Sequence, residues 1–156
     1  MTEQILNELF EYAREIRRRL HRYPEVGFEL PQTVSTVTEE LQKMGIDYSE
    51  KYGKSSIVAE IGDGEETVAF RADMDALPIE ENTGLEYSSE IKGAMHACGH
   101  DAHTAVLLAV AKHLKQNEGL LTRRVRLIFQ PAEECEVSGG LKYEADTSGK
   151  QAFILL

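Results

Sequence analysis

The chain has 156 residues, of which 42% are hydrophobic and 28% are charged, a composition that fits one globular domain with a buried core. Its formal net charge of −10 argues against a nucleic-acid partner, because phosphate binding needs clustered Lys and Arg side chains. The first twenty residues do not resemble a signal peptide, and the longest apolar run (105–111) is too short to cross a bilayer. The two cysteines do not suggest a disulfide-stabilised scaffold. We therefore expect a cytoplasmic protein without a membrane partner.

Hydrophobic periodicity predicts two helices in the first third of the chain. Residues 2–22 place an apolar side chain at every third or fourth position along one side. The segment 23–27, which contains a proline and a glycine, then breaks this pattern. A second helix is expected from Pro31, a favoured first-turn residue, to Met44, and Gly45 stops it.

Short strand patterns follow at residues 46–50, 56–61 and 67–72. The sequence Gly-Asp-Gly at 62–64 is typical of a tight turn, so the last two strands are expected to form a hairpin.

Residues 73–102 show no clean periodicity, and a long irregular connection of this kind is often functional. A helix is expected from about residue 102 to 116, apolar nearly all round, followed by an alternating strand at 123–130. The order of elements predicts an α/β fold in which helices flank a sheet.

Polar side chains with metal-binding chemistry stand at the ends of three of these elements. They are Asp73 and Asp75 after a strand, Cys98 and His100 before a helix, and Glu133 and Glu134 after another strand. Because open α/β sheets bind ligands beyond the carboxyl ends of their strands, the three sets are expected to converge.

The segment around Cys98 and His100 has two interpretations. Thiolate and imidazole are ligands of zinc-like ions, but an isolated cysteine is often simply buried and a loop histidine simply hydrogen-bonded. Asp101 could support a metal ligand or cap the following helix. His96 and His103 could be ligands, supporting residues or substrate contacts, and spacing alone does not separate these roles.

The carboxylate pairs are also open to two interpretations. Glu133 and Glu134 could be solvated surface charges, or one could coordinate an ion while its neighbour takes a proton from the attacking water. Asp73 and Asp75 could form turns, or one of them could orient a metal-binding histidine.

Four motifs carry a resemblance to a known family. Residues 21–29, 70–78, 95–104 and 129–134, in this order and at plausible separations, resemble the M20-type metallo-aminoacylases. These amidohydrolases act on N-acyl amino acids, hippurate-like substrates and auxin conjugates. The resemblance covers residues 1 to about 140.

The resemblance implies a three-layer, zinc-peptidase-like sheet flanked by helices and a small N-acyl amino acid substrate. It also implies one or two divalent ions, zinc or manganese, with Cys98, His100 and Glu134 as ligands. Glu133 matches the general acid/base and Asp75 matches the acidic residue that supports the metal. Asp73 stands where more distant relatives carry a ligand histidine, and we group Asp73, Asp101 and His103 with Asp75 as expected metal-site support.

The chain departs from the family at its end. Family members are longer and carry further ligand histidines, whereas no histidine follows His113 here. Residues 141–156 do not resemble the family, and the apolar residues 153–156 have no obvious partner strand.

We therefore expect residues 1–140 to be the N-terminal part of a catalytic domain and residues 141–156 to be a divergent tail. A truncated chain of this kind would have an incomplete site and little turnover alone, and its exposed sheet edges would favour homo-oligomers. A non-catalytic metal-binding remnant or module, and a folded domain without metal, are the alternatives.

Overall fold

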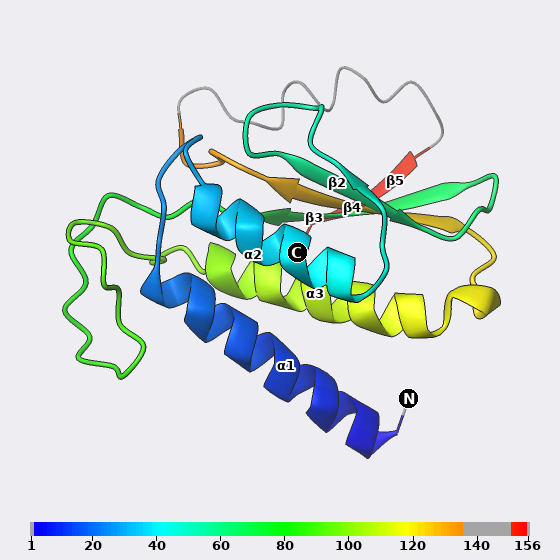
Figure 1. Cartoon of the computed structure of the whole chain (residues 1–156), viewed down its shortest axis with the longest axis horizontal. Coiled ribbons are helices and arrows are strands. Elements are labelled where there is room, and N and C mark those ends of the chain that lie inside the picture. The colour runs from blue at the N-terminus through cyan, green and yellow to red at the C-terminus, as the bar shows by residue number, and fades with distance from the viewer. Residues whose placement is uncertain (1, 136–150, 156) are drawn as a thin grey trace.

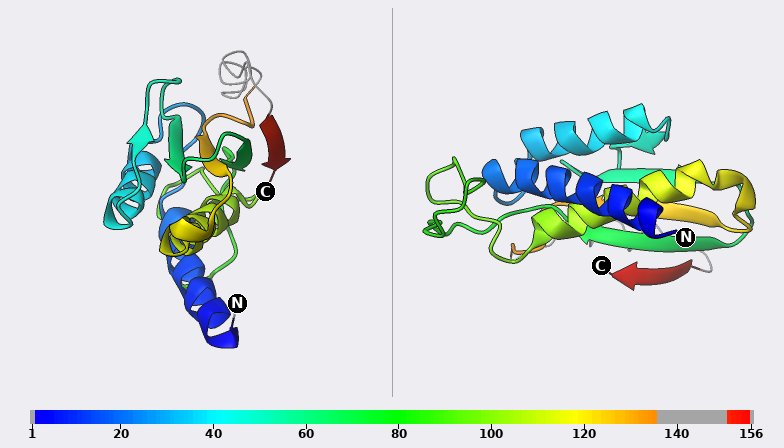
Figure 2. Two further views of the ribbon diagram at one scale, coloured as in Figure 1. Left: turned by 90° about the vertical axis from the view of Figure 1, so that its right-hand side faces the viewer. Right: turned by 90° about the horizontal axis from the view of Figure 1, so that it is seen from below.

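Three helices lie on one side of a five-stranded mixed sheet in the computed structural model, which describes residues 2–135 and 151–155 (Figure 1). The helices are α1 (Glu3–Arg22), α2 (Pro31–Lys43) and α3 (His100–Gln116), followed by the short 3₁₀ helix η1 (Glu118–Leu120). The strands are β1 (Tyr48–Ser49), β2 (Ile57–Ile61), β3 (Thr67–Asp73), β4 (Arg124–Gln130) and β5 (Gln151–Leu155). Both views of Figure 2 place α3 against the sheet and α1 on the outer side of α3.

The predicted α/β class is confirmed, and so are the predicted helices and most of the strands. In the described part of the chain the helices cover one face of the sheet, so two of the three expected layers are present. The third long helix begins at His100, two residues earlier than expected. Its first turn starts at Gly99, whose carbonyl accepts the backbone N–H groups of Ala102 (2.9 Å) and His103 (3.1 Å). The expected strand at 46–50 is confirmed only at Tyr48–Ser49.

The predicted hairpin between residues 56–61 and 67–72 is wrong. The sheet order is β1-β2-β4-β3-β5, so β4 lies between these two strands, antiparallel to β2 and parallel to β3. The local turn signal at 62–64 is real, but a strand from about sixty residues later in the sequence inserts between its arms. Because β3 and β4 are parallel, α3 serves as the crossover between them.

The main core lies between the sheet and the helices. On β4, Leu127 and Phe129 are fully buried in this core, while Ile128 points to the opposite face and contacts Val58 and Ala69 in a small second cluster. This alternation is the period-two pattern that identifies a strand. The strand order places β4 in the middle of the sheet, and its parallel pairing with β3 brings the carboxyl ends of the two strands together.

The expectation that the apolar end of the chain lacks a partner strand is wrong for the described residues. Residues 151–155 form β5, which pairs in parallel with β3. The expected boundary between residues 140 and 141 lies outside the described residues.

No helix in the described ranges is both long and apolar enough to span a membrane.

The turn between β2 and β3 provides a test of this topology. A Cβ atom on Gly64 would lie 2.6 Å from the Cα atom of Arg123, just before β4. We expect Gly64→Ala to lower the free energy of unfolding by about 1–3 kcal/mol, because backbone must move to relieve the overlap. Chemical denaturation measures this change.

Gly119 in η1 is the matched control, since a Cβ atom there would have no neighbour within 4 Å. Gly119→Ala is expected to change stability by less than about 0.5 kcal/mol. Equal stabilities for the two variants would contradict the inserted position of β4.

Candidate metal centre

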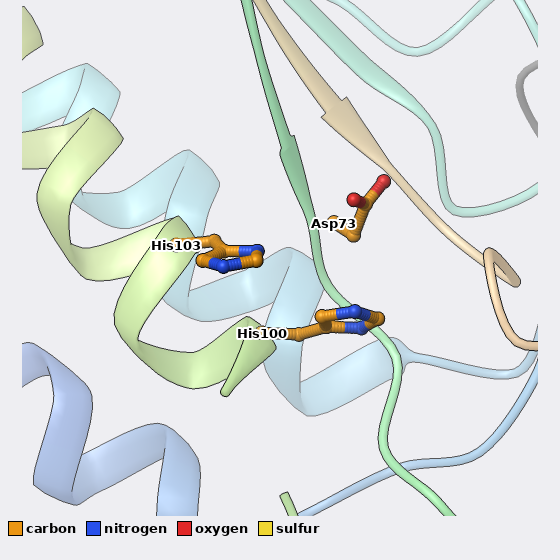
Figure 3. Close-up of side chains that lie close together, drawn as sticks. All are labelled: Asp73, His100 and His103. Carbon is orange, nitrogen blue, oxygen red and sulfur yellow. The ribbon is translucent and has the colours of Figure 1, made fainter. Parts of the chain in front are cut away.

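The ends of β3 and β4 bring the acidic segments of the chain together. Asp73 is the last residue of β3 and pairs with Gln130, the last residue of β4. The backbone N–H of Met74 then donates to the Gln130 carbonyl (2.8 Å). The first turn of α3 reaches the same edge, where His100 and His103 project near Asp73 (Figure 3). The structure therefore brings the three sets of polar residues to one place.

A buried carboxylate, that of Asp75, fixes the two glutamates that follow β4. Its Oδ1 accepts the backbone N–H of Glu133 (2.9 Å) and its Oδ2 accepts that of Glu134 (3.1 Å). Burial acts to raise the pKa of Asp75, but hydrogen bonds from His100 and from the two backbone N–H groups outweigh it and lower the pKa. Asp75 is therefore an anion that holds the Glu-Glu segment in place.

The backbone carbonyl of Asp75 determines the tautomer of His100. Its Nδ1 lies 2.8 Å from the Asp75 carbonyl oxygen, which can only accept, so Nδ1 carries the proton. The Nε2 lone pair is left as the ligand atom, and it lies 3.8 Å from carboxylate oxygens of both Glu133 and Glu134. This is the arrangement by which a backbone carbonyl orients a metal-binding imidazole. Burial acts to lower the pKa of His100, and the contacts with Asp75 outweigh it and raise the pKa.

Two left-handed backbone positions direct these side chains. Gly99, between Cys98 and His100, has φ of 89°, and a glycine adopts this conformation without steric cost. Ala132 has φ of 54° directly before Glu133, although it carries a Cβ atom and is fully buried. Left-handed conformation costs a non-glycine residue about 1–2 kcal/mol, so the surrounding contacts must hold Ala132 there.

Cys98, His100 and Glu134 offer ligand atoms that all lie within 4.8 Å of one another. The Cys98 side chain is exposed, and its thiol donates to the Glu134 carboxylate. This hydrogen bond, then burial and the nearby carboxylates, raise the pKa of Cys98 to about 11. Sulfur, imidazole nitrogen and carboxylate oxygen are a donor set that fits a zinc-like divalent ion, whose charge would favour the thiolate.

A second group shares His100. Asp73, His100 and His103 also offer ligand atoms within 4.8 Å of one another. Arg71 donates to one oxygen of the Asp73 carboxylate (3.3 Å), and the Asp73 carbonyl accepts from Thr104 Oγ1 (3.0 Å). Asp73 Oδ1 lies 3.2 Å from Arg71 Nε, so its carboxylate is already ion-paired. The buried His103 Nδ1 has no hydrogen-bond partner in the described part of the chain.

Asp101 contacts α1 rather than His100. Its fully buried carboxylate accepts from Arg17 Nε (2.8 Å) and lies 2.7 Å from His21 Nδ1. The other ring nitrogen of His21 is 3.3 Å from Glu81 Oε1. This network joins α1, the loop after β3 and the start of α3. Sequence reasoning did not select His21 as a site residue, although it opens the first of the four motifs.

His96 belongs to neither ligand group in the described residues. It is buried, and both of its ring nitrogens lack a hydrogen-bond partner there. Burial is the main cause that lowers the pKa of His96 to about 4, so its imidazole is neutral at physiological pH. Whether it contacts substrate stays a prediction.

Comparisons with known proteins agree with this geometry. The sequence profile of Peptidase family M20/M25/M40 matches residues 69–155, more than half of the chain. Thermostable carboxypeptidase 1 of Saccharolobus solfataricus is 46% identical over 140 residues, which are 88% of this chain and 36% of that protein. IAA-amino acid hydrolase ILR1-like 5 of Arabidopsis thaliana is 48% identical over 128 residues, 81% of this chain and 29% of that protein. The chain thus spans about a third of the length of these relatives.

A solved structure is similar over nearly the whole chain. The Bacillus subtilis YXEP protein, named a dinuclear metal binding peptidase from the M20 family, matches with a TM-score of 0.86 and 36% sequence identity. The match covers 96% of this chain and 43% of that one.

The role of Asp75 is open to a direct test. In Asp75→Asn the amide nitrogen would face one of the two backbone N–H groups, and the buried negative charge would be lost. We expect the free energy of unfolding to fall by about 2–3 kcal/mol and the affinity for Zn²⁺ to fall about 10–100-fold. Chemical denaturation and calorimetric titration measure the two effects.

Asp63→Asn, at an exposed position in the turn after β2, is the control and should change neither quantity. Wild-type zinc affinity in Asp75→Asn would show that Asp75 does not organise the ligands.

Proposed function

The chain belongs to Peptidase family M20/M25/M40, and from this membership we propose that it carries metal-binding and proton-transfer groups for hydrolysis of the amide bond in N-acyl amino acids. One observation carries the proposal. Both glutamates after β4 have a carboxylate oxygen 3.8 Å from the same His100 nitrogen, yet one of them belongs to a ligand group and the other does not. On this difference we assign Glu134 as a metal ligand and Glu133 as the base.

Cys98, His100 and Glu134 would hold the ion in this proposal, oriented by Asp75. When bound, a divalent ion supplies Lewis acidity to the reacting amide and to water. The donor set suits zinc, and manganese is the other metal we propose. A count of one or two ions is consistent with the dinuclear neighbour named above.

Glu133 would be the general acid and base. Its backbone is held by Asp75, while its side chain is 37% exposed and so can reach a water molecule and a substrate. The carboxylate would take a proton from water as the oxygen attacks the amide carbon. It would then give the proton to the leaving nitrogen, so that a carboxylic acid and an amine are released.

The names of two relatives support a proposal for the substrate class. One relative is named an IAA-amino acid hydrolase and another a thermostable carboxypeptidase. We propose a small N-acyl amino acid as the substrate, and neither nucleic acid nor membrane as partner for a chain of net charge −10. Homo-oligomer formation and a cytoplasmic location stay predictions.

Glu133→Gln separates metal binding from chemistry. The amide preserves the shape of the side chain and the backbone hydrogen bond to Asp75 but cannot take a proton. We expect zinc content to stay at the wild-type value, and release of free amino acid from N-acetyl amino acids and hippurate to fall about 10²–10⁴-fold. Because the chain covers about a third of its relatives, the assay uses high protein concentrations and quantifies the amino acid product.

Glu66→Gln serves as the control, since Glu66 is an exposed residue paired with Arg123 far from this edge of the sheet. Equal rates for Glu133→Gln and wild type would remove Glu133 from the mechanism. Hydrolysis that persists unchanged in the presence of a chelator would refute metal dependence.

A further inference from the structure

We propose that the outer face of α1 is a surface through which two copies of this chain associate, with their α1 helices antiparallel about a twofold axis. The inference goes beyond the proposed function and does not depend on it. Both views of Figure 2 place α1 on the outer side of α3, so the opposite face of α1 is open in the described part of the chain. The apolar side chains, the charges and the geometry of this face all fit a second copy.

Two large apolar side chains of α1 lie outside its packed side. That packed side contains Ile16 and Leu20, which are buried in the main core. Phe10, by contrast, is 63% exposed, and Leu6 is 50% exposed. Because Leu6 and Phe10 are four residues apart, they are neighbours on the helix surface and form one small apolar patch. Covering this patch with a second protein surface removes apolar area from water and so favours association.

The charges of α1 are divided between its two halves. Every charged residue from position 2 to 13 is acidic, whereas positions 14–22 contain five arginines and one glutamate. An antiparallel pair of α1 helices places the acidic half of each beside the basic half of the other, and a parallel pair would place like charges together. Antiparallel helix dipoles favour the same arrangement. The chain has a net charge of −10, so the basic half of α1 is a place where an acidic surface of a second copy is attracted.

Five exposed residues define a single stripe along this face. Their spacing of three or four positions, at about 100° per residue, keeps them within an arc of about 80°; they are Glu3, Asn7, Phe10, Arg14 and Arg18. A twofold axis between residues 10 and 11 brings Phe10 against Phe10 of the second copy. The same axis places Glu3 opposite Arg18 of the second copy and Asn7 opposite its Arg14. Each of these pairs occurs twice, because a twofold interface is self-complementary.

Glu3 and Arg18 are available for these ion pairs. Within the described residues neither forms an ion pair, and Arg18 lies over the Tyr87 ring, 4.8 Å from its centroid. Exposed ion pairs contribute little affinity, so the Phe10 contact drives association and the charges set the orientation. An interface made by one helix from each copy is small, and we expect a dissociation constant on the order of 10–100 µM.

Sedimentation velocity on the full chain, from about 1 to 300 µM, measures the association. Wild type is expected to pass from monomer to dimer over this range. Arg18→Glu and Glu3→Arg each turn both ion pairs into repulsions, and each should weaken the dimer at least about 10-fold. Phe10→Ser should weaken it by a similar factor, because the apolar contact at the axis is lost.

A mixture of the two charge variants tests the antiparallel register. The Glu3→Arg copy keeps Arg18 and the Arg18→Glu copy keeps Glu3, so a dimer with one of each has opposite charges in both pairs. We expect the equimolar mixture to dimerise with about the wild-type affinity, and the double variant Glu3→Arg/Arg18→Glu to dimerise alone. Recovery on mixing also shows that both single variants are folded.

Glu8→Arg is the matched control. It makes the same charge reversal in the same half of α1, but Glu8 is five residues from Glu3 and so about 140° round the helix, and dimerisation should not change. A chain that stays monomeric over the whole range overturns the proposal. A dimer that neither Arg18→Glu nor Phe10→Ser weakens also overturns it and assigns association to another surface, such as the sheet edges. Charge variants that weaken the dimer without recovery on mixing overturn the antiparallel pairing.

Discussion

The buried carboxylate of Asp75 joins the segments from which the metal centre is built. It accepts the backbone N–H groups of Glu133 and Glu134, and the carbonyl of the same residue accepts from His100. Three segments that are far apart in sequence are thus held by hydrogen bonds around one residue. The parallel pairing of β3 with β4 makes this possible, since it brings both carboxyl ends to one edge.

A consequence of this arrangement is a concentration of negative charge that a cation would relieve. Asp73 and the two glutamates lie close to the Cys98 thiol, whose pKa is raised to about 11 by the hydrogen bond to Glu134, by burial and by these carboxylates. Without a bound cation, the neighbouring carboxylates therefore keep the Cys98 thiol protonated. A divalent ion would provide the opposite response, thiolate formation, because its charge outweighs that of the carboxylates.

The sequence was sufficient to predict elements whose signal is local. The apolar spacing in α1 and the alternation in β4 predicted those elements, and the residue types around Cys98 and Glu133 predicted metal chemistry at the ends of elements. What failed was non-local. The turn at 62–64 could not indicate that β4 inserts between its arms, and periodicity could not show that His21 on α1 reaches Asp101 on α3. Long-range pairing depends on the whole sheet, and no window of sequence contains it.

The most direct test of the account is the metal content of the chain purified without chelator, measured by elemental analysis for wild type and for Cys98→Ala/His100→Ala. Because His100 belongs to both ligand groups, the double variant removes at least one ligand from each group. The account predicts about one or two divalent ions per wild-type chain and a loss of that metal in the double variant. No stoichiometric metal in wild type, or the same amount in both proteins, would contradict it.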